Sequence, residues 1–275
     1  MADPFLGTPY RRSAHDSPDK QVAESRGDGR WGGDAHGCRY ASRGSNLANI
    51  YLHYVFDLWA ERWRHRTVRE NVIFVRYADD IIAGFEHEAD ARRFLTDLKQ
   101  RMEQYALSLH PDKARLIEFG CFAANNRARR GLGKPETFNF LGFTHICGRA
   151  YRNGKFILIR MTRRDRMCSK LRDIKEELRR RMHLSIPEQG KWLCQVVMGF
   201  FAYHAIPTNS KRIVSFWYHV IELWRCTLCR RSQRDYFTWD KISRLASYWL
   251  PSPRILHPWP NIRFAVNHPR WKPGA

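Results

Sequence analysis

Two adjacent carboxylates, Asp79 and Asp80, stand between two short apolar runs rich in β-branched residues, Val72–Val75 and Ile81–Ala83. Apolar runs separated by a turn signal predict strand, turn, strand, and Asp tolerates the backbone of a tight turn. We therefore predict a β-hairpin with two carboxylates at its tip. Neighbouring carboxylates repel each other unless a cation lies between them, and oxygen ligands favour Mg²⁺ or Mn²⁺. Two such ions about 4 Å apart can hold the attacking and leaving oxygens of phosphoryl transfer.

The neighbouring residues are needed to distinguish a metal-binding pair from an ordinary hairpin turn, because Asp-Asp alone is also common in such turns. Tyr77-Ala78-Asp79-Asp80 between apolar strands resembles the YADD box of reverse transcriptases, in particular of group II intron reverse transcriptase/maturases. The resemblance implies RNA-directed DNA synthesis. It also implies that Asp79 and Asp80 bind Mg²⁺ (or Mn²⁺) as catalytic residues, while Tyr77 and Ala78 lie beneath the primer terminus.

Three further stretches resemble the same family in the same order. Leu47–His53 resembles the helix after the template-positioning loop, although the loop motif itself is not matched upstream. Lys113 resembles a lysine that faces the catalytic site near the leaving pyrophosphate; a solvated turn lysine is the alternative. Phe140, Leu141 and Gly142 belong to a Phe-Leu-Gly-Phe stretch that resembles the primer-grip hairpin, where Gly would let the sugar-phosphate approach the backbone.

Composition indicates a polyanionic partner. The 275 residues include 48 Lys and Arg against 27 Asp and Glu, which gives a net charge of +21. This balance predicts binding to RNA, and DNA is the second candidate. No apolar run approaches the roughly 20 residues of a membrane span, so we expect no membrane partner. Seven scattered cysteines, an odd number, predict a reducing compartment and hence a cytoplasmic location.

From Met161 onward the apolar spacing predicts helices, with later members at 188–205, 210–228 and 239–249. This unit resembles the thumb, or maturase domain X, of group II intron proteins, best at Gly199–Tyr203, Asn209 and Leu228–Gln233. A charged face is usually only solvated, but Arg binds phosphate through two parallel hydrogen bonds. We predict eight RNA-binding arginines, three in a basic loop at 120–135 and five in the helical unit: Arg127, Arg129, Arg130, Arg163, Arg164, Arg230, Arg231 and Arg234.

The expected fold class is α+β, in four segments. Residues 1–45 are rich in Gly, Ser, Asp and Arg and are predicted to be disordered. Residues 46–160 should form a partial reverse-transcriptase palm, a short antiparallel sheet with amphipathic helices near 47–59 and 89–105. Residues 161–250 should form the all-α thumb/maturase domain, and residues 251–275 an extended tail.

The resemblance also implies missing parts. In the family a third carboxylate lies on a strand upstream of the template-positioning loop, and the fingers precede it; neither is recognisable here. The chain therefore resembles the C-terminal part of such an enzyme, truncated at its N-terminus, and we expect the hairpin strands to lack neighbours. Three hypotheses follow: an RNA-directed DNA polymerase, completed in principle by another chain; a non-catalytic module that binds structured RNA; and an inactive, degenerate remnant.

Overall fold

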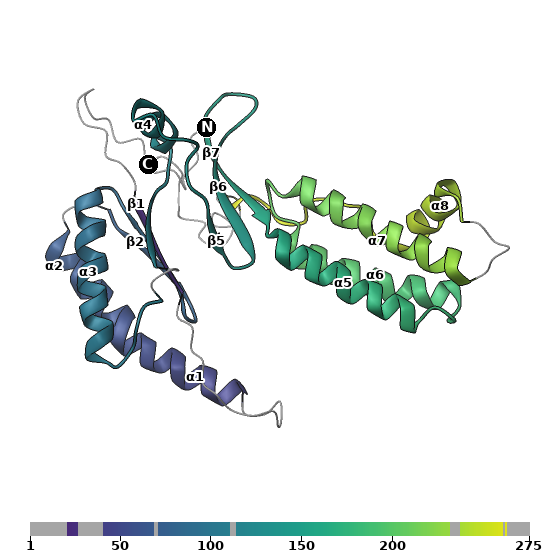
Figure 1. Cartoon of the computed structure of the whole chain (residues 1–275), viewed down its shortest axis with the longest axis horizontal. Coiled ribbons are helices and arrows are strands. Elements are labelled where there is room, and N and C mark those ends of the chain that lie inside the picture. Colours follow the sequence, from purple (N-terminus) through teal and green to yellow (C-terminus); the bar gives the residue numbers. More distant parts are fainter. Residues whose placement is uncertain are drawn as a thin grey trace. The chain divides into compact units, whose positions relative to one another are not determined.

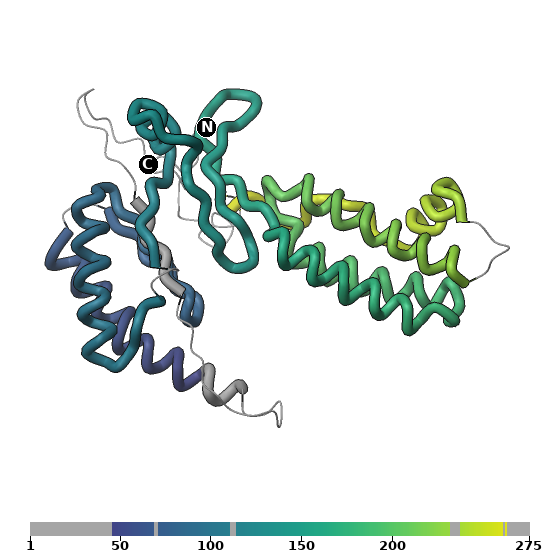
Figure 2. The backbone as a smooth tube through the Cα atoms, viewed as in Figure 1, coloured from purple at the N-terminus to yellow at the C-terminus, as the bar shows by residue number. Residues whose placement is uncertain are grey.

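The computed structural model describes residues 21–26, 41–68, 71–110, 114–231, 237–260 and 262, with only the backbone described at 21–26 and 41–45 (Figure 2). The described residues form two compact units. The N-terminal unit runs to Phe138 and includes Ile146–Leu158, whereas the C-terminal unit comprises Asn139–His145 and the chain from Ile159 onward. Each unit has its own hydrophobic core. Helices and small antiparallel sheets together confirm the α+β class.

The N-terminal unit is built on a four-stranded sheet in the order β2-β3-β1-β4. Its strands are β1 (Gln21–Arg26), β2 (Ile73–Tyr77), β3 (Asp80–Phe85) and β4 (Arg115–Glu118). All neighbours run antiparallel. With its helices the unit follows a β-α-β-β-α-β order, the split βαβ arrangement. The predicted hairpin and the predicted strand after the second helix are both confirmed.

Strand β1 lies inside the segment for which no regular structure was predicted. It pairs with β3 and with β4, so the expectation that the hairpin lacks neighbours is wrong for β3. The sequence Gln-Val-Ala-Glu-Ser-Arg has no apolar run, and its pairing comes from the strands on either side rather than from its own propensity. The first helix also begins earlier than expected, at Ala41. The rest of residues 1–40 lies outside the described part.

One long helical run and one separate helix cover a face of this sheet (Figure 1). The run consists of α1 (Ala41–Leu52), the π-helical η2 (His53–Asp57) and α2 (Leu58–Thr67), and the separate helix is α3 (Glu88–Gln104). The aromatic core joins both to the hairpin, because the Phe94 ring lies 4.9 Å from that of Phe74 and 4.9 Å from that of Trp63. Both predicted amphipathic helices are therefore confirmed.

The apolar stripe expected at 47–59 is only partly buried. Val55 is buried, but Leu47 and Tyr54 are 68% and 64% exposed. In Figure 1, α1 extends beyond the sheet. The buried face of the run is carried by residues nearer its centre and end, chiefly Phe56, Ala60 and Trp63.

A second sheet, in the order β5-β6-β7, consists of β5 (Phe138–Phe140), β6 (Phe143–Arg149) and β7 (Phe156–Thr162). The predicted Asn153-Gly154 turn joins β6 to β7, with Gly154 at φ +64°. The stretch 120–135, predicted to be a basic loop, contains the short helix α4 (Ala123–Arg129). That part of the prediction is wrong because Ala and Arg are strong helix formers and no glycine interrupts them before Gly131.

The C-terminal unit is a bundle of α5 (Arg164–Arg180), α6 (Ile186–His204) and α7 (Ser210–Arg231), with the shorter α8 (Trp239–Trp249) packed on α6 and α7 (Figure 1). These helices confirm the pattern predicted from Met161 onward. Helix α6 starts at a capping box formed by Ser185 and Glu188, with Pro187 in its first turn. In the core, the Trp224 indole donates to Gln189 Oε1 at 2.9 Å.

A buried asparagine joins strand β7 to this bundle. Asn209 is fully buried; its Oδ1 accepts from the Thr162 amide at 2.9 Å, and its Nδ2 donates to Thr162 Oγ1 at 2.7 Å and to the His204 carbonyl at 2.8 Å. These bonds satisfy the amide fully, which makes it a strong local constraint. Across the described helices, none combines the length and the apolar composition that crossing a bilayer requires.

Candidate nucleic-acid site

The hairpin between β2 and β3 turns in two residues. Tyr77 pairs with Asp80, which leaves Ala78 and Asp79 as the central pair. Ala78 has φ +54°, in the left-handed region. A positive φ at the first central residue is typical of a type II′ turn, where Gly is the usual residue. An alanine there is strained, and such strain persists only when the surroundings hold it.

Arg76 provides the support for this strained turn. Its Nε and one terminal nitrogen donate to the two carboxylate oxygens of Asp57, both at 2.7 Å, and its other terminal nitrogen donates to the Ala78 carbonyl at 2.9 Å. That nitrogen also reaches Asn49 Oδ1 at 3.2 Å. The hydrogen bonds from Arg76 are the main cause that lowers the pKa of Asp57, and the same bonds raise the pKa of Arg76. The long helical run therefore holds the hairpin tip through one guanidinium.

The two carboxylates at the tip differ in their exposure to solvent. Asp79 is exposed and Asp80 is half-buried, next to strand β1, where the backbone register places Arg26 opposite Asp80. In the described residues, no three His, Cys, Asp or Glu side chains come together as a metal site. A pair of divalent ions needs more oxygen ligands than two carboxylates. The described donor set therefore does not fit a two-metal centre, and no chemical step can be derived through one.

The predicted Phe-Leu-Gly-Phe hairpin is present between β5 and β6. Leu141 and Gly142 are its two central residues, with φ +48° and +77°, as in a type I′ turn. The Tyr203 hydroxyl donates to the Leu141 carbonyl at 2.8 Å, and the Arg163 amide donates to the Gly142 carbonyl at 3.1 Å. The tip is thus held by α6 and by the start of α5.

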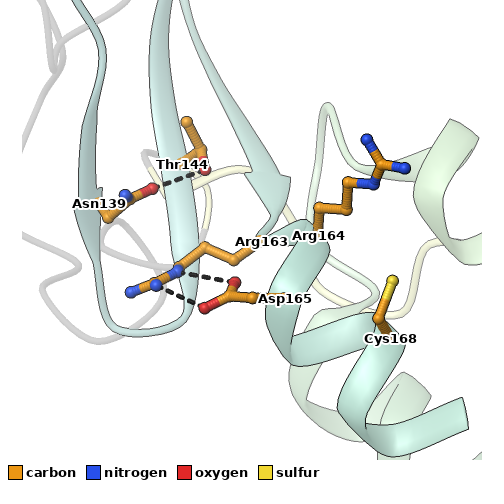
Figure 3. A pocket seen from close by; sticks show the side chains of 6 residues that line it. All are labelled: Asn139, Thr144, Arg163, Arg164, Asp165 and Cys168. Atoms are coloured by element: carbon orange, nitrogen blue, oxygen red, sulfur yellow. Dashed lines mark hydrogen bonds and ion pairs between the residues drawn. The ribbon is translucent and has the colours of Figure 1, made fainter. Parts of the chain in front are cut away.

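A polar pocket of about 480 Å³ lies beside this hairpin (Figure 3). Figure 3 shows the Arg163 guanidinium extending toward the hairpin while Arg164 extends away from it. Arg163 is paired with Asp165 through bonds of 3.0 and 2.5 Å, and no ion pair involves Arg164 within the described part of the chain. Because the Asp165 carboxylate also lines the pocket and holds Arg163, Arg164 is the lining cation that remains for a phosphate group. Its lining residues are Asn139, Thr144, Arg163, Arg164, Asp165 and Cys168.

The arginines predicted at 120–135 divide into two kinds. Arg127 donates to the Gly133 carbonyl at 3.1 Å and pairs with Glu136 at 3.3 Å, and Arg130 pairs with the buried Glu118. Arg127 therefore stabilises the turn that follows α4, and Arg130 joins the end of α4 to the end of β4. Arg129 is exposed. Of these three arginines, Arg129 is the one best placed to meet a ligand without giving up an internal contact.

The remaining predicted residues lie at the end of α7 or outside the described chain. Arg230 and Arg231 are exposed, and Arg231 donates to the Leu184 carbonyl at 2.9 Å. Lys113 and Arg234 are not among the described residues. Sequence reasoning missed Arg76 and Asp57, although an arginine immediately before Tyr-Ala-Asp-Asp was a signal for a charged support of the tip.

Comparison with known families agrees with the first hairpin and its surroundings. Residues 40–145 match the sequence model of the family described as reverse transcriptase (RNA-dependent DNA polymerase). The match spans the long helical run, the β2–β3 hairpin, α3, β4, α4, and β5 with the start of β6. This stretch is therefore similar to reverse transcriptases. No curated protein matches the chain.

Proposed function

We propose that this chain is an RNA-binding protein of the group II intron reverse transcriptase/maturase type, and that its C-terminal unit carries the binding surface. In this proposal the RNA is a structured intron RNA, which the bundle holds through its arginines. The two carboxylates of the first hairpin do not by themselves support DNA synthesis.

The observation that carries the proposal is the contrast between an incomplete acidic tip and a strongly basic bundle. Residues 161–250 contain 18 Lys and Arg against 8 Asp and Glu. Several of these cations, such as Arg164, Arg166 and Lys170, are exposed and form no ion pair with any described residue. An excess of exposed guanidinium groups on one unit is the electrostatic pattern of a phosphate-binding surface.

The test is RNA binding by the full chain at increasing salt. A labelled intron-like stem-loop should bind, and the logarithm of the affinity should fall linearly with the logarithm of the salt concentration. Replacing Arg163, Arg164 and Arg166 together by Gln should reduce both the affinity and that slope. A salt-independent affinity, or one unchanged in the triple variant, would show that the bundle is not the binding surface.

RNA-directed DNA polymerisation is the second candidate, favoured by the family match over 40–145 and by the strained Ala78 turn. Here Asp79 and Asp80 would hold Mg²⁺, with Lys113 near the leaving group and Phe140, Leu141 and Gly142 at the primer end. Primer extension on an RNA template tests it. Activity lost in Asp79→Asn would establish a working metal site and require a third ligand from undescribed residues or another chain.

A further inference from the structure

A second groove in the C-terminal unit lies between α5 and α6, with an accessible volume of about 490 Å³. Each helix contributes one stripe of residues spaced four apart. Helix α5 presents Arg166 and Lys170, and helix α6 presents Gln195, Gly199 and Tyr203. All five are exposed. One wall is therefore cationic, while the other offers an amide, a bare stretch of backbone and an aromatic ring.

The floor of this groove is apolar and uncharged near neutral pH. It is formed by Val196, Phe200 and His204. Phe200 is buried, and burial lowers the pKa of His204 to about 4. The groove volume lies within the range of small-molecule sites, which commonly combine an apolar floor with a few polar groups at the rim.

Two glycines of α6 differ in what surrounds them in the described part of the chain. A Cβ at Gly190 would lie 2.6 Å from two ring atoms of Trp249, so that glycine makes room for α8. A Cβ at Gly199 would meet nothing within 4 Å. Glycine is a poor helix former, and nothing in the described fold requires it at position 199. The open space above Gly199 lets a ligand approach the helix backbone.

Tyr203 is held rigidly at the end of the same stripe. Its hydroxyl donates to the Leu141 carbonyl at 2.8 Å, and its ring stacks on Phe143 with centroids 5.6 Å apart and an interplanar angle of 21°. The side chain is nevertheless 52% exposed. A fixed, half-exposed aromatic ring is a preorganised stacking surface, because a ligand need not immobilise it.

We propose that this groove binds one unpaired nucleotide of an RNA strand, with its phosphates on Arg166 and Lys170 and its base over Gly199 against Tyr203. The proposal rests on the RNA-binding function proposed above and specifies which part of an RNA is recognised. A phosphate needs the two cations, and a base needs a flat, open surface beside an aromatic ring. A continuous duplex keeps its bases stacked and therefore cannot fill the groove.

The decisive variant is Gly199→Leu, which fills the groove without straining the helix. Fluorescence anisotropy of the full chain compares three labelled RNAs of about 12 nucleotides: a single strand, a blunt duplex, and a duplex with one bulged nucleotide. The wild-type chain should bind the first and third more tightly than the second. Gly199→Leu should lose about tenfold in affinity for those two probes and keep its duplex affinity. Met198→Leu places the same side chain at an exposed position outside the groove and should change nothing.

The melting temperature of the variant distinguishes a folded protein with a blocked groove from a misfolded protein. Gly199→Leu should leave the melting temperature unchanged or raise it by about 3 °C, because Leu is the better helix former. Arg166→Gln should lower the salt slope for single strands by about 0.7, the value for one phosphate contact. Unchanged single-strand affinity in a folded Gly199→Leu variant would overturn the groove assignment alone. A wild-type chain that binds none of the three RNAs would overturn the proposed function as well.

Discussion

The two hairpin tips of the molecule both contain a non-glycine residue with a positive φ, and a different chemical group supports each of them. Each turns in two residues, and each places a non-glycine residue, Ala78 or Leu141, in the left-handed region. In both, a side chain from outside the turn donates to the carbonyl of the strained residue. At Ala78 the donor is the Arg76 guanidinium, which Asp57 holds; at Leu141 it is the neutral hydroxyl of Tyr203.

Because of this difference, the stability of the two tips should depend on charge to different extents. The Ala78 tip depends on an ion pair, so it should respond to the loss of either charge. The Leu141 tip depends on a residue that also lines the α5–α6 groove, so it should respond to what binds there. The Ala78 tip should therefore be the one that depends on charge, and the Leu141 tip should be the one that responds to an RNA bound in the proposed groove.

The largest expected effect comes from Arg76→Ala. It leaves Asp57 without its main partner and releases the Ala78 turn, at a cost of about 2 kcal/mol in the stability of the N-terminal unit. Hydrogen exchange of peptides from β2 and β3 measures the loss. Arg76→Lys should recover only part of it, because an ammonium cannot make the two parallel bonds. Full protection in Arg76→Ala would show that the ion pair does not support the tip.

The next largest effect should come from acidification, which should destabilise the C-terminal unit before the N-terminal unit. Burial lowers the pKa of His145, which Arg160 lowers further, and burial alone lowers that of His204, both to about 4. The unfolded chain therefore binds protons that the folded C-terminal unit does not, so this unit loses stability as the pH falls from about 6.5 toward 4. Asp57, with its lowered pKa, supports the N-terminal unit until the pH falls below about 4.

The measurement for that prediction is hydrogen exchange of both units at pH 7, 5.5 and 4.5, corrected for the intrinsic pH dependence of exchange. Peptides from α6 should lose protection first, and His204→Phe should reduce the loss. Earlier loss from β2 and β3 would contradict the assignment of the acid sensitivity to His145 and His204.

Tyr203→Phe should have a smaller effect. It removes one hydrogen bond to Leu141 and keeps the ring, so the C-terminal unit should lose about 1 kcal/mol. Single-strand RNA affinity should fall only slightly, whereas Tyr203→Ala should lose about tenfold because the stacking surface is gone. Equal affinity losses in the two variants would mean that the hydroxyl, rather than the ring, meets the RNA.

The smallest effects are stabilising. Ala78→Gly and Leu141→Asn put the preferred residue at each strained position, and each should raise the stability of its own unit by about 0.5 kcal/mol. Chemical denaturation measures the change. Destabilisation by either variant would show that the methyl or the leucine side chain contributes packing that outweighs the strain.

Local patterns predicted most of the fold. The alternating burial of β3 and the helical spacing of α3 and α5 to α8 are visible in the sequence, because side-chain burial follows the period of each element. Strand β1 could not be predicted, because its pairing comes from β3 and β4 rather than from its own residues. The stripe around Leu47 and Tyr54 predicted a helix correctly, but periodicity does not show whether another element covers it.

The candidate site was predicted less completely. Asp79 and Asp80 fall at a hairpin tip as expected, because turn chemistry is local. Leu141 and Gly142 were expected in a hairpin only from the resemblance of Phe-Leu-Gly-Phe to the primer grip. The α5–α6 groove was not predicted, since Arg166 and Tyr203 lie 37 positions apart in the sequence and meet only through helix packing. The open space at Gly199 and the filled one at Gly190 likewise depend on tertiary neighbours.

The most direct test of the central claim compares RNA affinity in two charge variants of the full chain at one salt concentration. We expect Asp79→Asn/Asp80→Asn to bind single-stranded RNA as tightly as the wild-type chain, with or without Mg²⁺. We expect Arg166→Gln/Lys170→Gln to lose about tenfold in affinity. Binding that requires Mg²⁺ and the two aspartates, and that survives loss of the two cations, would contradict it and place the RNA at the first hairpin instead.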